Sequence, residues 1–79
     1  MKITIHYYGR LIESAGREKE DIVLSTGNTL AVLERVLSER YPDFSNIPLT
    51  FFSNSRICET NFPLNEGMSI ECMPPFSGG

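Results

Sequence analysis

The last six residues of the sequence, Pro74 to Gly79, are the strongest candidates for a chemical role. Two glycines at a chain end add nothing to a hydrophobic core, and they raise the conformational entropy of the terminus. Without side chains, however, Gly78 and Gly79 can enter a narrow channel and place the α-carboxylate against a phosphate and a nucleophile. Six extended residues reach at most about 20 Å, which is enough to enter a partner's pocket from the surface. We therefore predict that the carboxylate of Gly79 is the reacting group.

Two prolines stand immediately before this end. Each proline has a fixed φ, so the tail has fewer conformations to lose when it docks. We expect a partner's channel to bind the segment that precedes the reacting residue, namely Pro74, Pro75, Phe76, Ser77 and Gly78. A frayed end or an artefact of expression would also leave two terminal glycines. The prolines and the terminal position favour the functional interpretation.

Length, composition and charge limit the function classes. A chain of 79 residues supports one domain and leaves little room for an enclosed substrate cavity, so we expect catalysis to need a partner. The hydrophobic fraction of 41% is that of an ordinary globular protein. The net charge of −3, without a run of Lys or Arg, argues against nucleic acid as a direct ligand. No window approaches the ~18 apolar residues of a spanning helix, so we expect no membrane segment and a cytoplasmic location.

Alternation of apolar and polar residues predicts a sheet. In the first segment Ile3, Ile5 and Tyr7 alternate with polar neighbours, which is the period of a half-buried strand. The predicted strands are residues 2–8, 21–24, 49–52, 56–58 and 68–73. The prolines that follow the last strand end all pairing, because proline has no backbone N–H to donate.

Helical spacing predicts one main helix between the second and third strands. Its apolar positions are Leu30, Leu33, Val36 and Leu37. Asn28 or Thr29 is the expected N-cap. The helix should end by Tyr41, because Pro42 disfavours the helical conformation at the residue before it. A short helical turn over residues 10–15 is also expected.

This order of elements is typical of an α+β protein with the β-grasp fold. In that fold one main helix covers one face of a mixed sheet of four to five strands. The first and last strands pair in parallel at the centre of the sheet. We therefore expect a β-grasp domain over residues 1–73 and a flexible tail over residues 74–79.

Over its whole length the chain resembles the small subunits of molybdopterin synthase, within the wider ubiquitin-like sulfur-carrier family. The most specific part runs without a gap from Asn54 to Gly79. Its motifs are Pro63-Leu64, the acidic-glycine turn Glu66-Gly67, and Pro74-Pro75-Phe76-Ser77-Gly78-Gly79. The family usually has an aspartate where this chain has Glu66. It usually has an aromatic pair where this chain has Cys72 and Met73.

The resemblance implies a role in a sulfurtransferase complex. An ATP-dependent activating enzyme would adenylate the carboxylate of Gly79, because a carboxylate needs a phosphate leaving group before sulfur can replace oxygen. The resulting thiocarboxylate would deliver sulfur to a pterin precursor in molybdenum cofactor biosynthesis. The large catalytic subunit of molybdopterin synthase would supply the basic residues and the pterin pocket. This chain would then bind no metal or cofactor itself and would not be catalytic alone.

Two alternatives use the same free Gly-Gly end. The chain is also compatible with a sulfur carrier for thiamine synthesis or tRNA thiolation. A protein of another class, a ubiquitin-like modifier that forms isopeptide bonds with target lysines, needs the same terminus. Fold kinship alone does not choose a pathway.

Three apolar residues lie out of phase with the inward pattern and match the family's partner-facing positions. They are Tyr8, Ile57 and Met73. Exposed apolar residues on one sheet face are typical of a protein interface. The alternative is a scatter of surface hydrophobes, which is normal on any protein.

The remaining polar and sulfur-containing residues are expected to be structural. His6 has no second ligand at metal spacing, so we interpret it as a solvated sheet residue and predict no metal. Cys58 and Cys72 are expected to be reduced and half-buried. The outer face of the main helix is expected to be a solvated surface formed by Glu34, Arg35, Glu39 and Arg40.

Overall fold

The computed structural model describes residues 1–75 of the chain. Phe76, Ser77, Gly78 and Gly79 lie outside the described residues. In chain order, the elements are β1 (Lys2–Tyr7), α1 (Arg10–Ala15), β2 (Lys19–Val23), α2 (Leu30–Arg40), the 3-10 helix η1 (Pro42–Asn46), β3 (Thr50–Ser53), β4 (Arg56–Cys58) and β5 (Ser69–Met73). None of the helices within residues 1–75 has the length and apolar character that a membrane span requires.

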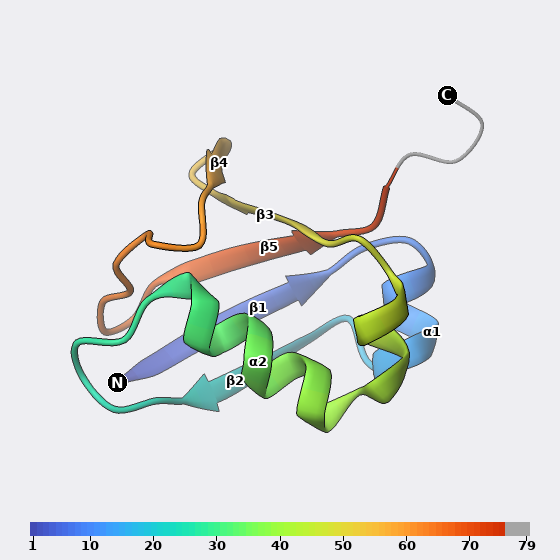
Figure 1. Ribbon diagram of the computed structural model, residues 1–79, viewed down its shortest axis with the longest axis horizontal. Coiled ribbons are helices and arrows are strands. Elements are labelled where there is room, and N and C mark those ends of the chain that lie inside the picture. The colour runs from blue at the N-terminus through green and yellow to red at the C-terminus, as the bar shows by residue number, and fades with distance from the viewer. Residues whose placement is uncertain (76–79) are drawn as a thin grey trace.

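The five strands form one mixed sheet in the order β2-β1-β5-β3-β4 (Figure 1). The first and last strands, β1 and β5, run parallel at its centre, with Ile5 opposite Ile70. The other neighbouring strands are antiparallel. This topology confirms the predicted β-grasp fold and its parallel central pair.

The main helix α2 lies across one face of the sheet (Figure 1). Thr29 takes an extended conformation at its N-cap position, and Tyr41 leaves the helical conformation before Pro42, as expected. The buried apolar side chains between sheet and helices include Ile3, Ile5, Tyr7, Leu11, Ile22, Leu30, Leu33, Leu37, Phe44, Phe51, Ile70 and Cys72. One core therefore lies on the α2 side of the sheet, and the opposite face has no helix across it among residues 1–75.

Two elements differ from the expectation by more than one residue at an end, whereas β1, β3 and β5 differ by one residue. Strand β2 begins at Lys19, two residues before the predicted start at Asp21, because Glu20 is buried on the inward face. A buried glutamate conceals the alternation that a strand prediction depends on. The 3-10 helix η1 was not expected; it places the buried side chain of Phe44 against the core, and it begins with Pro42, which suits a first helical position.

Candidate functional site

The chain leaves the sheet at its centre. Strand β5 lies between β1 and β3 and ends at Met73, directly before Pro74. Pro74 is half-buried and lies against Gly9, where a Cβ atom would come within 3.2 Å of the proline Cγ. Pro75 is exposed. The other expected channel-binding residues and the reacting residue Gly79 are among those outside the described part of the chain.

The sheet face opposite α2 presents one row of side chains that crosses all five strands. From β2 to β4 the row consists of Lys19, His6, Glu71, Phe52 and Ile57, each beside the next in register. Residues paired in register point to the same face, because side chains alternate along each strand. We call this side of the sheet the open face. Its row changes from charged and polar at β2 to apolar at β4.

The residues predicted to meet a partner lie on the open face. Tyr8 is 38% exposed and Ile57 is 65% exposed. Met73 is half-buried and alternates with the inward side chain of Cys72. Phe52 joins them through its pairing with Ile57, and sequence reasoning had not singled it out. The alternation of side chains along a strand could have identified it: Phe52 lies between Phe51 and Ser53, which are buried on the inward face, so it must point to the open face.

A hydrogen bond links two residues of the open face. The hydroxyl of Tyr8 donates to Oε2 of Glu71 over 3.0 Å. This bond raises the pKa of Tyr8 above its ordinary value, and burial and the negative charge of Glu71 add to the effect. The tyrosine therefore stays protonated and keeps its donor role at neutral pH.

A shallow depression surrounds this pair. It has a volume of about 290 Å³ and is lined by His6, Tyr8, Asn54, Ser55, Ser69 and Glu71. Asn54 and Ser55 reach it from the β3–β4 turn, where both have positive φ, as a tight hairpin turn requires. The depression is open to solvent and polar, which suits a side chain of a docked protein better than a small molecule.

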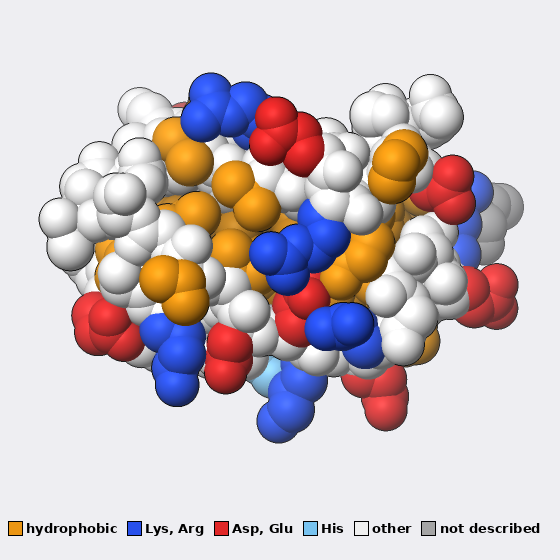
Figure 2. Space-filling model, turned by 90° about the horizontal axis from the view of Figure 1, so that it is seen from below, with side chains coloured by type: hydrophobic (Ala, Val, Ile, Leu, Met, Phe, Trp, Pro, Cys, Tyr) orange, Lys and Arg blue, Asp and Glu red, His pale blue; other side chains and the backbone are white. Residues whose placement is uncertain are grey.

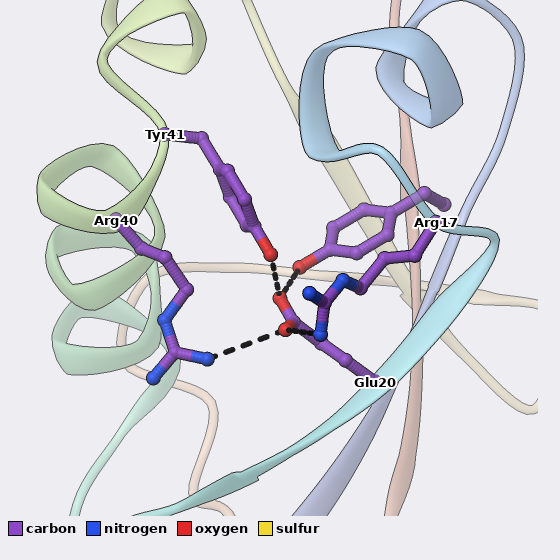
Figure 3. A network of polar contacts seen from close by, with 5 residues as sticks. Arg17, Glu20, Arg40 and Tyr41 are labelled. Atoms are coloured by element: carbon purple, nitrogen blue, oxygen red, sulfur yellow. Dashed lines mark hydrogen bonds and ion pairs between the residues drawn. The ribbon is translucent and has the colours of Figure 1, made fainter.

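A second polar group is buried on the inward side. Glu20 accepts hydrogen bonds from the hydroxyls of Tyr7 and Tyr41 and from Arg17 and Arg40 (Figure 3). Arg17 and Arg40 lie 3.1 and 3.2 Å from the same carboxylate oxygen. Arg40 is exposed, as expected for the outer face of the helix, and its guanidinium also joins α2 to β2 through Glu20. The network ties the main helix to the sheet.

The network changes the acidity of its members. Burial, the largest single effect, raises the pKa of Glu20, but the hydrogen bonds from Tyr41 and Tyr7 and the charges of Arg40 and Arg17 together lower it below its ordinary value. Burial and the hydrogen bond to Glu20 raise the pKa of Tyr7 far above its usual range. The carboxylate is therefore ionised and the tyrosine protonated at neutral pH.

The two cysteines do not form a nucleophilic site. Both are free, with exposed fractions of 8% for Cys58 and 0% for Cys72, so they are more deeply buried than expected. Burial, with a smaller effect of the Glu34 charge, raises the pKa of Cys72 to about 12. Because the thiolate is the nucleophile, a thiol with so high a pKa stays protonated and is unreactive at neutral pH.

On the face drawn in Figure 2, the charged side chains form no patch of only positive or only negative charge. Figure 2 shows Lys and Arg side chains interspersed with Asp and Glu side chains, with apolar side chains between them. Within residues 1–75 there is no group of three His, Cys, Asp or Glu side chains that could hold a metal ion.

Comparison with known proteins relates this arrangement to a family. The ThiS family matches residues 5–79. No curated protein sequence matches the chain. The similar solved structures include a candidate molybdopterin converting factor subunit 1 from Pyrococcus furiosus, with a TM-score of 0.89 and 21% identity over 96% of this chain and 99% of that one.

Two further structures are similar over their full lengths. SAMP1 from Haloferax volcanii, a small archaeal modifier protein, has a TM-score of 0.87 and 17% identity, covering 100% of both chains. A complex of subunits 1 and 2 of molybdopterin-converting factor from Helicobacter pylori contains a chain with a TM-score of 0.70 and 23% identity, covering 100% of both chains. At these identities the structures support the fold. The family match extends over nearly the whole chain, and the chain therefore belongs to the ThiS family of ubiquitin-like sulfur carriers.

Proposed function

We propose that this chain is the small, sulfur-carrying subunit of a molybdopterin synthase. The observation that carries the proposal is the place where the last strand ends: the central strand β5 ends at Met73 on the apolar part of the open face, and the sequence continues directly as Pro-Pro-Phe-Ser-Gly-Gly. A partner that covers this face is in position to receive the tail. The molybdopterin-converting factor proteins among the similar structures support this pathway.

The proposed reaction uses the carboxylate of Gly79 in two steps. First, an activating enzyme lets this carboxylate attack the α-phosphate of ATP, which forms an acyl adenylate and releases pyrophosphate. Sulfide from a sulfur donor then attacks the acyl carbon, forms the C–S bond, displaces AMP and leaves a thiocarboxylate. The thiocarboxylate is a nucleophilic sulfur that the large subunit directs to its pterin substrate.

The buried titratable groups of the chain contribute no base to this reaction. Cys72 is buried and protonated, and the Glu20 network lies on the inward side of the sheet. Neither group is available to a substrate on the open face. The proposal therefore assigns ATP binding to the activating enzyme and the pterin pocket to the large subunit.

A second candidate is a protein modifier. Its specific support is the similarity to SAMP1, which extends over 100% of both chains with a TM-score of 0.87. In that case the activated carboxylate of Gly79 would be transferred to a lysine amine and would form an isopeptide bond. The family match also keeps the thiamine pathway as an alternative for the sulfur carrier.

Reconstitution with alternative partners separates these functions. The thiocarboxylated chain is mixed with the large molybdopterin synthase subunit and the pterin precursor, or with a thiazole synthase and its substrates. The proposal predicts molybdopterin in the first reaction and no thiazole product in the second. Thiazole product alone, or conjugates of the chain on lysines with no sulfur transfer, would contradict it.

A further inference from the structure

Glu71 occupies the middle of the open face, and among residues 1–75 no Lys or Arg side chain forms an ion pair with it. It lies on the central strand β5, between His6 on β1 and Phe52 on β3. Every ion pair found within residues 1–75 involves another carboxylate, the pairs being Lys2–Asp21, Arg17–Glu20 and Arg40–Glu20. The one side-chain hydrogen bond found for Glu71 there comes from Tyr8.

The surroundings of Glu71 on the β3 side are those of an interface. Phe52 is its register neighbour and is half-buried, and Ile57 beyond it is 65% exposed. Charged residues are depleted at the centre of protein interfaces, and aromatic residues are enriched there. A glutamate at this place therefore needs an explanation.

Docking of a partner makes the Glu71 carboxylate unfavourable for binding unless the partner places a cation beside it. A protein that covers Phe52 and Ile57 also removes water from the neighbouring carboxylate. A desolvated carboxylate with one neutral hydrogen bond is strongly unfavourable, whereas one that meets a guanidinium or ammonium group can be net favourable. The shallow depression at Glu71 and Tyr8 provides the volume for such a side chain.

We propose that the partner covering the open face inserts an arginine or lysine side chain into the depression at Glu71, with apolar contacts to Phe52 and Ile57 around it. The inference rests on the proposed function, which supplies the partner. It goes beyond that function because it specifies the partner's chemistry: an apolar surface with one central cation. The same pairing would reject partners that present a carboxylate there.

Asp21 provides the matched control. It lies on the same sheet face, but it accepts a hydrogen bond from Thr4 over 2.7 Å and is 3.9 Å from the ammonium group of Lys2. Its charge is already compensated within the chain, and it lies on β2, two strands away from Glu71 on β5. A general effect of lost negative charge would appear equally in Glu71→Gln and Asp21→Asn.

The test is a calorimetric titration of the full chain with the large subunit of molybdopterin synthase from the same organism. We expect Glu71→Gln to raise Kd by about tenfold or more and Glu71→Lys by about 100-fold or more, with Asp21→Asn within about threefold of wild type. Added salt should weaken the wild-type complex more than the Glu71→Gln complex, because only the former contains the pair. The thermal unfolding midpoints of all variants should remain near that of the wild type.

The sign of the Glu71→Gln effect decides the inference. If no cation faces Glu71, neutralising it removes a desolvation cost, so that unchanged or tighter binding would overturn the proposal. A wild-type chain that does not bind the large subunit contradicts the proposed function instead. The same variants are then titrated with the activating enzyme, and a wild-type chain that binds neither protein overturns both.

Discussion

Gly9 and Pro74 are in contact where the chain leaves the sheet. A Cβ on Gly9 would lie 3.2 Å from Cγ of Pro74, and Gly9 has a φ of +58°, which L side chains rarely adopt. The contact joins the loop after β1 to the first residue after β5. Because β1 and β5 are the parallel central pair, Gly9 and Pro74 both lie at the end of the two central strands.

Alanine at Gly9 should destabilise the fold more than alanine at other turn glycines. We expect Gly9→Ala to lower the free energy of unfolding by about 1–3 kcal/mol, because it adds a steric contact to backbone strain. Gly67→Ala, at a φ of +79° with nothing within 4 Å of the new Cβ, should cost about 1 kcal/mol and leave thiocarboxylation intact. Denaturant unfolding measures both. Equal losses would show that the proline contact has no energetic weight.

The Glu20 network should make stability depend on pH. The folded state lowers the pKa of Glu20, so its contribution is fully present above the unfolded value of about 4.3 and is lost as pH falls through the folded pKa. Glu20→Gln should cost about 1–3 kcal/mol at pH 7, since it weakens the four charge-assisted hydrogen bonds that the buried carboxylate accepts.

Unfolding free energies at pH 7, 5 and 3 test this assignment. The difference between wild type and Glu20→Gln should shrink as the solution becomes more acidic. Asp21→Asn serves as a control on the same strand, because Asp21 is exposed. A difference that stayed constant across this range would mean that the charge of Glu20 is not what stabilises the network.

A charge placed on the apolar part of the open face should weaken partner binding and leave the fold intact. Met73→Asp and Ile57→Asp should each raise the Kd for the large subunit by about 30-fold or more, because an unpaired charge at an interface centre costs several kcal/mol. Val23→Asp is the control, since Val23 is 77% exposed on the edge strand β2. Unchanged affinity of the first two variants in a titration would refute the interface.

The local sequence pattern predicted the helices and strands, because the signal for each of them lies within a few neighbouring residues. Alternation of Ile3, Ile5 and Tyr7 is a property of one strand, and Pro42 ends a helix through its own sterics. The parallel pairing of β1 and β5 came from the order of elements. These predictions needed no knowledge of which distant side chains meet.

Contacts between residues that are far apart in the sequence could not be predicted from the sequence alone. Glu20 meets Arg40 and Tyr41 across 20 and 21 positions, and nothing in the local pattern marks them as partners. The row through Glu71 and Phe52 depends on strand register, which a single sequence does not specify. Phe76 to Gly79 lie outside the described residues, so the assignment of the tail stays a prediction.

The central claim is that the carboxylate of Gly79 acquires sulfur, and deletion of that residue tests it most directly. Residues after Pro75 follow the last strand, so the deletion should leave the unfolding midpoint unchanged. The reacting carboxylate, however, must lie about 3–3.5 Å from its target, and a misplacement of about 1 Å can cost roughly 100-fold in rate. Removal of one residue shifts it further than that.

The measurement is the intact mass of the chain after incubation with the activating enzyme, ATP and a sulfur donor. The native chain is predicted to gain the mass difference of one sulfur for one oxygen. The chain that ends at Gly78, and a chain extended by one residue beyond Gly79, are predicted to gain nothing while unfolding as the native chain does. A truncated chain that acquired sulfur at its new end as fast as the native chain would contradict the claim.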